Sequence, residues 1–172
     1  MNALRDKFYL ASGYASGLCI VLIMLIILAQ VVGRFFGFIV PSAEDFSGYA
    51  LAAATFFGLA YTFHEGGHIR VTLVIQKWSK RARYRQELVV LVFALALTSF
   101  IAYYSWHMIW ESYVFEEVSY GYIPVPLWIP QIPVGLGSLA LTIAVLDDLI
   151  LLLIGKEPSY MPHEGEITME EL

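Results

Sequence analysis

A histidine and glutamate pattern near the middle of the chain has the spacing of a zinc-binding motif. His64, Glu65 and His68 form the sequence HExxH. On a helix, two histidines four residues apart lie on the same face, where they can bind Zn²⁺ while the glutamate acts as a general base. The chemistry that this pattern offers is metal-assisted hydrolysis, provided that one continuous helix holds both histidines.

Two glycines stand between these histidines and weaken the zinc interpretation. Adjacent glycines such as Gly66 and Gly67 disfavour the rigid helix that would keep two imidazoles in register. They are more typical of a helix end. We therefore expect a helix to stop here. An intramembrane zinc metalloprotease, with Asp147 or Asp148 as third ligand, stays as the alternative function.

The histidines could also be axial ligands of a membrane di-haem cytochrome. That protein class needs histidine pairs that face each other inside a helix bundle. His64 and His68 fall near one predicted membrane surface, His107 falls near the other, and His163 lies in the C-terminal tail. They do not pair by depth, so we predict no catalytic residue, no metal ligand and no cofactor on this chain.

The composition of the chain places its helices in a membrane. Of the 172 residues, 59% are hydrophobic and 15% are charged, whereas a soluble domain has about 25% charged residues. Apolar runs over residues 11–32, 42–63, 88–110 and 130–154 are each long enough to cross a hydrocarbon core of about 30 Å. We predict an all-α integral membrane protein with four transmembrane helices and a short interfacial segment between the first two.

The basic residues predict the orientation of these spans. Arg34 is the only one of the ten Lys and Arg residues expected on its side of the membrane. The others lie near the N-terminus, in the loop 64–87 and in the tail, so the positive-inside rule makes both termini cytoplasmic. The basic cluster 80–85 would meet anionic lipid head groups. Topology explains this charge without nucleic acid.

Almost the whole chain belongs to one predicted membrane domain, residues 1–154, followed by an acidic tail, 155–172, that we expect to be mobile. The first three spans carry no charge in their middles, and no internal repeat is visible. A transporter commonly has repeats and polar groups near the membrane midplane. We therefore predict an accessory subunit, not an enzyme and not a complete transporter.

Charged residues at the outer ends of the first two spans have two interpretations. Ser42 is predicted to be the N-cap of the second helix, with Glu44 and Asp45 in its first turn, and Arg34 follows the end of the first span. Arg34 and the two acids could cap the helices and pair with each other, or they could hold another protein.

Small residues predict where helices pack. Ala50, Ala54, Gly58 and Thr62 recur every four residues and form a stripe that another helix can approach closely. In the fourth span, Asp148 shares a face with two alanines, so we expect it to point toward protein. The alternatives are a wet Asp148 beyond the helix end, a pair with a basic group of a partner, or a salt bridge within the chain.

Five short motifs resemble a known family. In chain order they are Gly33-Arg34, Ser42-Ala43-Glu44-Asp45, Phe57-Gly58-Leu59-Ala60, Gly67-His68-Ile69-Arg70-Val71 and Ile129-Pro130-Gln131-Ile132-Pro133-Val134-Gly135. Together they resemble the small membrane (Q, DctQ-like) subunit of the tripartite ATP-independent periplasmic (TRAP) transporters. That family commonly has an acidic residue shortly after the fourth motif. Thr72 stands there in this chain, so no role of that acid is carried over.

The resemblance implies partners that do the transport. A large membrane (M) subunit would carry the substrate and sodium sites and move as an elevator, and a periplasmic binding protein would deliver an organic acid such as a C4-dicarboxylate or a sialic acid. The small subunit would be a scaffold for sodium-driven uptake in a bacterial inner membrane. Another four-span assembly subunit is a further alternative.

Two sets of residues follow as interface candidates. The candidates for contact with a partner subunit are Arg34, Glu44, Asp45, Ala50, Ala54, Gly58, His68, Arg70 and Asp148. The candidates for docking the binding protein are Glu111, Glu116 and Glu117.

Overall fold

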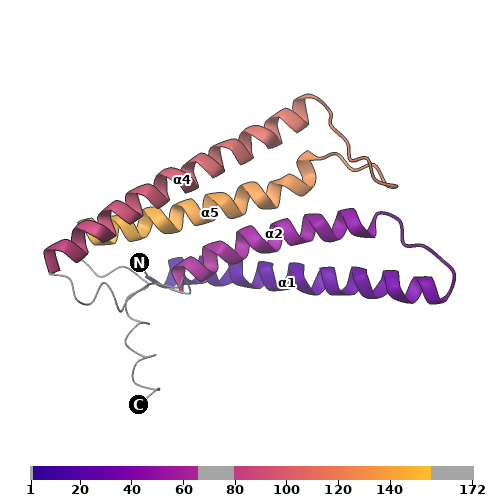
Figure 1. Cartoon of the computed structure of the whole chain (residues 1–172), viewed down its shortest axis with the longest axis horizontal. Coiled ribbons are helices and arrows are strands. Elements are labelled where there is room, and N and C mark those ends of the chain that lie inside the picture. The colour runs from indigo at the N-terminus through magenta and orange to yellow at the C-terminus, as the bar shows by residue number, and fades with distance from the viewer. Residues whose placement is uncertain (1, 66–79, 156–172) are drawn as a thin grey trace, which may run out of the picture.

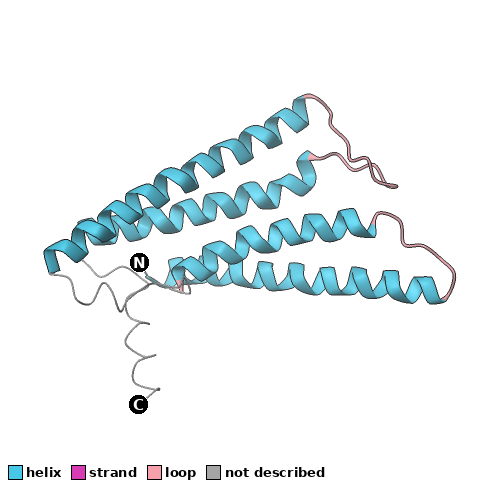
Figure 2. Cartoon of the chain, viewed as in Figure 1, coloured by secondary structure: helices cyan, strands magenta, loops and turns pink. Residues whose placement is uncertain are grey.

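Four α-helices make up the structure, a computed structural model that describes residues 2–65 and 80–155. They are α1 (Asn2–Phe35), α2 (Ala43–His64), α4 (Lys80–Val114) and α5 (Trp128–Leu153). Each is long and apolar enough to cross a membrane. Within the described ranges, Figure 2 shows only helices and the loops that join them. The predicted all-α class with four helices of spanning length is confirmed.

The helices form an open row, not a closed bundle. α1 packs against α2, α2 packs against α5, and α5 packs against α4. Figure 1 shows this order, with α1 and α4 at the two edges. Each edge helix therefore has one main neighbour, and none of the residues in the most apolar part of α1 is buried.

The two ends of the row carry different connections. At one end, on the left in Figure 1, lie the start of α1, the end of α2, the start of α4 and the end of α5. At the other end, the linker 36–42 joins α1 to α2 and the loop 115–127 joins α4 to α5. The linker 36–42 is the segment that we predict to lie at the membrane interface.

α1 and α4 are longer than the apolar runs that predicted them. They contain 34 and 35 residues, because charged residues such as Arg and Glu are good helix formers and hydropathy marks only the part that crosses the membrane. At a rise of about 1.5 Å per residue, α4 is roughly 52 Å long, far more than a core of about 30 Å. It must tilt or project from the membrane.

Small residues bring α2 and α5 close together. A Cβ atom added to Gly137 of α5 would lie 2.8 Å from the backbone carbon of Phe56 and 3.0 Å from the nitrogen of Phe57. Ala140 and Ala144, farther along α5, are also buried. Near the opposite end of α5, the core cluster Leu91, Val145, Leu149 and Leu152 joins this helix to α4.

Candidate functional site

The HExxH pattern lies at a helix end, as the paired glycines predicted. α2 ends at His64, and the backbone N–H of Glu65 closes the last turn on the carbonyl of Tyr61 at 3.0 Å. His68 lies outside the described residues. Among the residues that the structure describes, no group of three or more His, Cys, Asp or Glu side chains could hold a metal ion.

The small-residue stripe of α2 contacts α1 of the same chain. The hydroxyl of Ser16 donates a hydrogen bond to the carbonyl of Ala54 at 2.8 Å, and Ser12 donates to the carbonyl of Phe57 at 2.9 Å. A Cβ on Gly58 would lie 3.0 Å from the Ser16 hydroxyl. The stripe predicted a helix-packing surface, and in this chain the part around Ala54 and Gly58 packs on α1.

Sequence reasoning missed the two serines that complete this contact. Ser12 and Ser16 are four residues apart, so they lie on one face of α1. Both are surrounded by apolar residues, where a hydroxyl is expected to seek a carbonyl of a neighbouring helix. Their spacing was the available signal. Ala50 and Thr62, at the two ends of the α2 stripe, are half-buried.

The predicted pairing of Arg34 with the acids of α2 is not formed. Arg34 and Glu44 are both exposed, and the ion pairs of the described residues do not include them. Asp45 is half-buried and contacts the position of Gly121 in the loop 115–127. The predicted positions at the helix ends are confirmed, since Arg34 lies in the last turn of α1 and both acids lie in the first turn of α2. The predicted pairing among them is wrong, and the exposed Arg34 and Glu44 stay available to another protein.

Ser42 occupies the N-cap position of α2 but does not cap the helix. Its backbone is left-handed, with φ of 55°, and its side chain makes no capping hydrogen bond. Instead, its hydroxyl accepts a hydrogen bond from the backbone N–H of Ile123 at 2.9 Å. The predicted N-cap position is confirmed, but the expected capping hydrogen bond is not formed, because the hydroxyl is used by the distant loop.

That loop is a hairpin, which the sequence did not predict. Its base is closed by the N–H of Leu127, which donates to the carbonyl of Glu117 at 2.9 Å. Farther out, the N–H of Ser119 donates to the carbonyl of Val125 at 2.9 Å. The tip reaches Ser42, so the hairpin ties the α4–α5 pair to the start of α2. The loop contains Pro124 and Pro126, which are typical of an irregular segment and give no sign of its pairing.

The three glutamates near the end of α4 differ in their contacts. Glu111 lies 3.2 Å from Nδ1 of His107, one turn earlier on α4. Glu117 accepts a hydrogen bond of 2.7 Å from the buried hydroxyl of Ser112. Glu116 is exposed and has a left-handed backbone, with φ of 51°. Glu111 and Glu117 are exposed, but each contacts a side chain of α4, whereas Glu116 faces a cleft described below.

The buried acid of α5 lies inside the protein. Asp148 is 1% exposed, on the same face as the buried Ala140 and Ala144. The interpretation of Asp148 as a wet residue beyond the helix end is wrong, because α5 continues to Leu153. Its neighbour Asp147 is half-buried.

A second acid at this end escaped sequence reasoning. Glu87 of α4 is buried, and its carboxylate lies 3.2 Å from Nε of Arg83. The spacing of four residues between opposite charges was the available signal. Arg70 and the acidic tail from residue 156 onward lie outside the described residues.

Four apolar helices in a row, with polar contacts at the helix ends and between α1 and α2, define a small multi-pass membrane protein. Residues 23–155 match the family of the DctQ component of tripartite ATP-independent periplasmic transporters. The match includes all of α2, α4 and α5. The chain belongs to this family and is a transporter component, as its motifs indicated. The comparison with curated proteins finds no match.

Proposed function

We propose that this chain is the scaffold subunit of a TRAP-type secondary transporter, bound beside a large elevator-type membrane subunit. The large subunit carries the sodium and substrate sites, and a periplasmic binding protein delivers an organic acid, such as a C4-dicarboxylate or a sugar acid like sialic acid. The observation that carries this proposal is the family match across residues 23–155.

The open row of helices supports a scaffold role. A carrier that moves through the bilayer needs a static neighbour that offers a long contact in the membrane. α1 is unburied along its apolar part, and residues such as Leu18 and Leu25 are more than half exposed. Such a surface suits lipid or the helices of another subunit. The helices of residues 2–65 and 80–155 form an open row, without a closed interior through which a solute could pass.

The arrangement of helix ends supports the proposed orientation. The start of α1 and the end of α5 lie at the same end of the row, together with the start of α4 (Figure 1). The first turns of α4 contain Arg81, Arg83 and Arg85. We place this end in the cytoplasm of a bacterial inner membrane, where basic side chains are retained and can meet anionic lipids.

The exposed charges at the opposite end are the proposed contacts with other subunits. Arg34 and Glu44 are the strongest candidates because they are exposed and not paired with each other. Asp45, next to Glu44, and Ala50, six residues after Glu44 on α2, are both half-buried. Three other candidates for contact with a partner subunit, Ala54, Gly58 and Asp148, pack against helices of this chain and would act through that packing. The last two candidates, His68 and Arg70, lie outside the described residues.

The acidic end of α4 is the proposed docking region for the binding protein. Glu111, Glu116 and Glu117 lie there, and a basic patch on the binding protein would complement them. Glu111 and Glu117 already contact side chains of this chain. Their negative charge would therefore increase the association rate with the binding protein more than it would add new contacts.

The test is purification of the full chain from its native membrane in mild detergent, followed by identification of bound proteins and metals. A stoichiometric large membrane subunit, and solute uptake by the reconstituted complex that requires a sodium gradient, are the expected results. A lone chain that holds about one zinc ion would overturn the proposal and favour the metalloprotease alternative, with His64, Glu65 and His68 as its site.

A further inference from the structure

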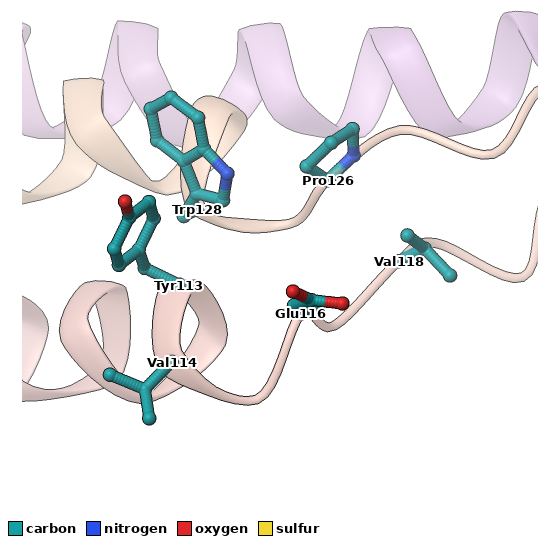
Figure 3. Close-up of a pocket in the computed structure, with 6 residues that line it drawn as sticks. All are labelled: Tyr113, Val114, Glu116, Val118, Pro126 and Trp128. Atoms are coloured by element: carbon teal, nitrogen blue, oxygen red, sulfur yellow. The ribbon is translucent and has the colours of Figure 1, made fainter.

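A cleft of about 530 Å³ lies where α4 passes into the hairpin loop. It is lined by side chains of the helix end, the hairpin and the start of α5: Tyr113, Val114, Glu116, Val118, Pro126 and Trp128. Figure 3 shows Tyr113 and Trp128 facing each other, with the carboxylate of Glu116 beside them and below Pro126. The cleft thus combines one carboxylate with aromatic and apolar walls.

The electrostatics of the cleft favour a cationic ligand. Within the described residues, Glu116 has no ion-pair partner, in contrast to Glu111. The last turn of α4 has no basic residue, so no cationic side chain in that turn offsets the negative end of the helix dipole. Among the Lys and Arg residues that the structure describes, only Arg34 lies at this end of the row, on another helix. The cleft therefore offers negative charge from both a side chain and a helix end.

The aromatic walls suit the same kind of ligand. The rings of Tyr113 and Trp128 meet edge to face, with centroids 5.8 Å apart and planes at 87°. An ammonium group near an aromatic face gains a cation–π attraction. The tyrosine hydroxyl and the indole N–H are also donors, which can serve a phosphate next to that ammonium.

The surface of α4 that leads away from the cleft favours a lipid over other ligands that carry a cationic group. Exposed apolar side chains recur along one side of α4 and lead toward Val114: Phe93, Leu97, Phe100, Tyr103 and Trp110. One leaflet of a core of about 30 Å corresponds to roughly ten helical residues, so this stripe is long enough for an acyl chain. Tyr113, Trp110 and Trp128 are the residue types that gather at the depth of lipid head groups.

We propose that this cleft binds the head group of an amine-bearing phospholipid, phosphatidylethanolamine, from the leaflet at this end of α4. Its ammonium pairs with Glu116 beside Tyr113 and Trp128, and an acyl chain follows the apolar stripe. A lysine or arginine of a partner protein has the same charge, but the stripe and the aromatic belt favour the lipid. The inference goes beyond the transporter role and does not depend on it.

The experiment is native mass spectrometry of the full chain, together with any subunit that co-purifies, after addition of phosphatidylethanolamine or phosphatidylglycerol. We expect a preference of about tenfold for phosphatidylethanolamine, the size of one charge-assisted hydrogen bond. Glu116→Gln, which keeps the shape but removes the charge, should abolish this preference. Equal binding of the two lipids by the unmodified protein would overturn the proposal.

Two further variants separate the site from general effects. Glu111→Gln removes a carboxylate from the same helix outside the cleft and should leave the lipid preference unchanged. Glu116→Gly removes the charge where φ is 51°, a backbone that glycine adopts without strain, so backbone strain cannot account for a loss of lipid binding in that variant. If Glu116→Gln instead abolished cross-linking to a partner protein while lipid binding stayed intact, the cleft would be a protein contact and the lipid proposal wrong. Neither result alters the test of the transporter role, which rests on co-purification and uptake.

Discussion

The hydroxyl of Ser42 accepts a hydrogen bond from the backbone N–H of Ile123, which lies 81 residues farther along the chain. This contact joins the start of α2 to the tip of the hairpin, and Gly121 of the same tip contacts Asp45. The hairpin thereby connects the α4–α5 pair to the linker side of the α1–α2 pair.

Removal of the Ser42 hydroxyl should loosen the hairpin locally. Ser42→Ala leaves the Ile123 N–H without its acceptor, at a cost of about 1 kcal/mol, which corresponds to roughly fivefold faster amide exchange around residue 123. Hydrogen exchange with mass spectrometry measures this change. Ser47→Ala, farther along the first turns of α2, is the control. Unchanged exchange in Ser42→Ala would show that other contacts hold the tip.

Gly58 should tolerate no large side chain. In Gly58→Leu the new side chain meets Ser16, since a Cβ alone would lie 3.0 Å from its hydroxyl. Overpacking of this kind costs about 1–3 kcal/mol, so thermal unfolding in detergent should occur at a lower temperature. Gly17→Leu on α1 is the matched control, because nothing lies within 4 Å of a Cβ there. Equal unfolding temperatures for the two variants would contradict the α1–α2 packing.

The hydroxyls of Ser12 and Ser16 should stabilise the α1–α2 pair. Hydrogen bonds between helices in membranes are worth about 0.6 kcal/mol on average and up to about 1.7. Ser12→Ala with Ser16→Ala should therefore lower the free energy of unfolding by about 1–3 kcal/mol in detergent or bicelles. Ser99→Ala, at an exposed site of α4, should have no effect. If the double variant were as stable as the control, these two hydrogen bonds would not stabilise the α1–α2 pair.

Arg34 and Glu44 should affect assembly without affecting the fold. Both are exposed and make no ion pair with each other, so Arg34→Ala and Glu44→Ala should leave the unfolding temperature of the chain unchanged. If they contact the large subunit in a desolvated interface, each should reduce its co-purification by about tenfold or more. Arg81→Ala, at the opposite end, serves as the control. Full co-purification in both outer variants would place the interface elsewhere.

Most of the helices could be predicted from sequence, whereas their pairing could not. Apolar runs identified four helices because charged side chains are costly in hydrocarbon, and because the backbone there must make its own hydrogen bonds within a helix. The apolar runs placed the starts of α1 and α4 too late, since charged residues continue a helix beyond the membrane as well as they end it. The stripe with Ala54 and Gly58 marked a packing surface correctly. Small residues permit close approach without specifying the partner, so the choice of α1 required the structure.

The candidate site was harder to predict because its contacts are distant in sequence. Ser42 had the residue type and position of an N-cap, but a hydroxyl can accept only where a donor is near, and the donor comes from residue 123. The cleft at Glu116 likewise depends on the meeting of the α4 end with Pro126 and Trp128. His64 and Glu65 needed no structure to be set aside as a helix end, because two glycines follow them directly.

The single-file order of α1, α2, α5 and α4 also determines what must be displaced when this protein assembles. A closed four-helix bundle keeps one side of every helix away from lipid. A row that is one helix thick instead exposes two broad flanks, and its width is three interaxial distances of about 8–10 Å each. A subunit that binds to one flank therefore displaces the ordered acyl chains that covered this flank. The entropy of those released lipids, rather than of released water, would drive association, so the stability of the complex should follow the lipid composition of the membrane.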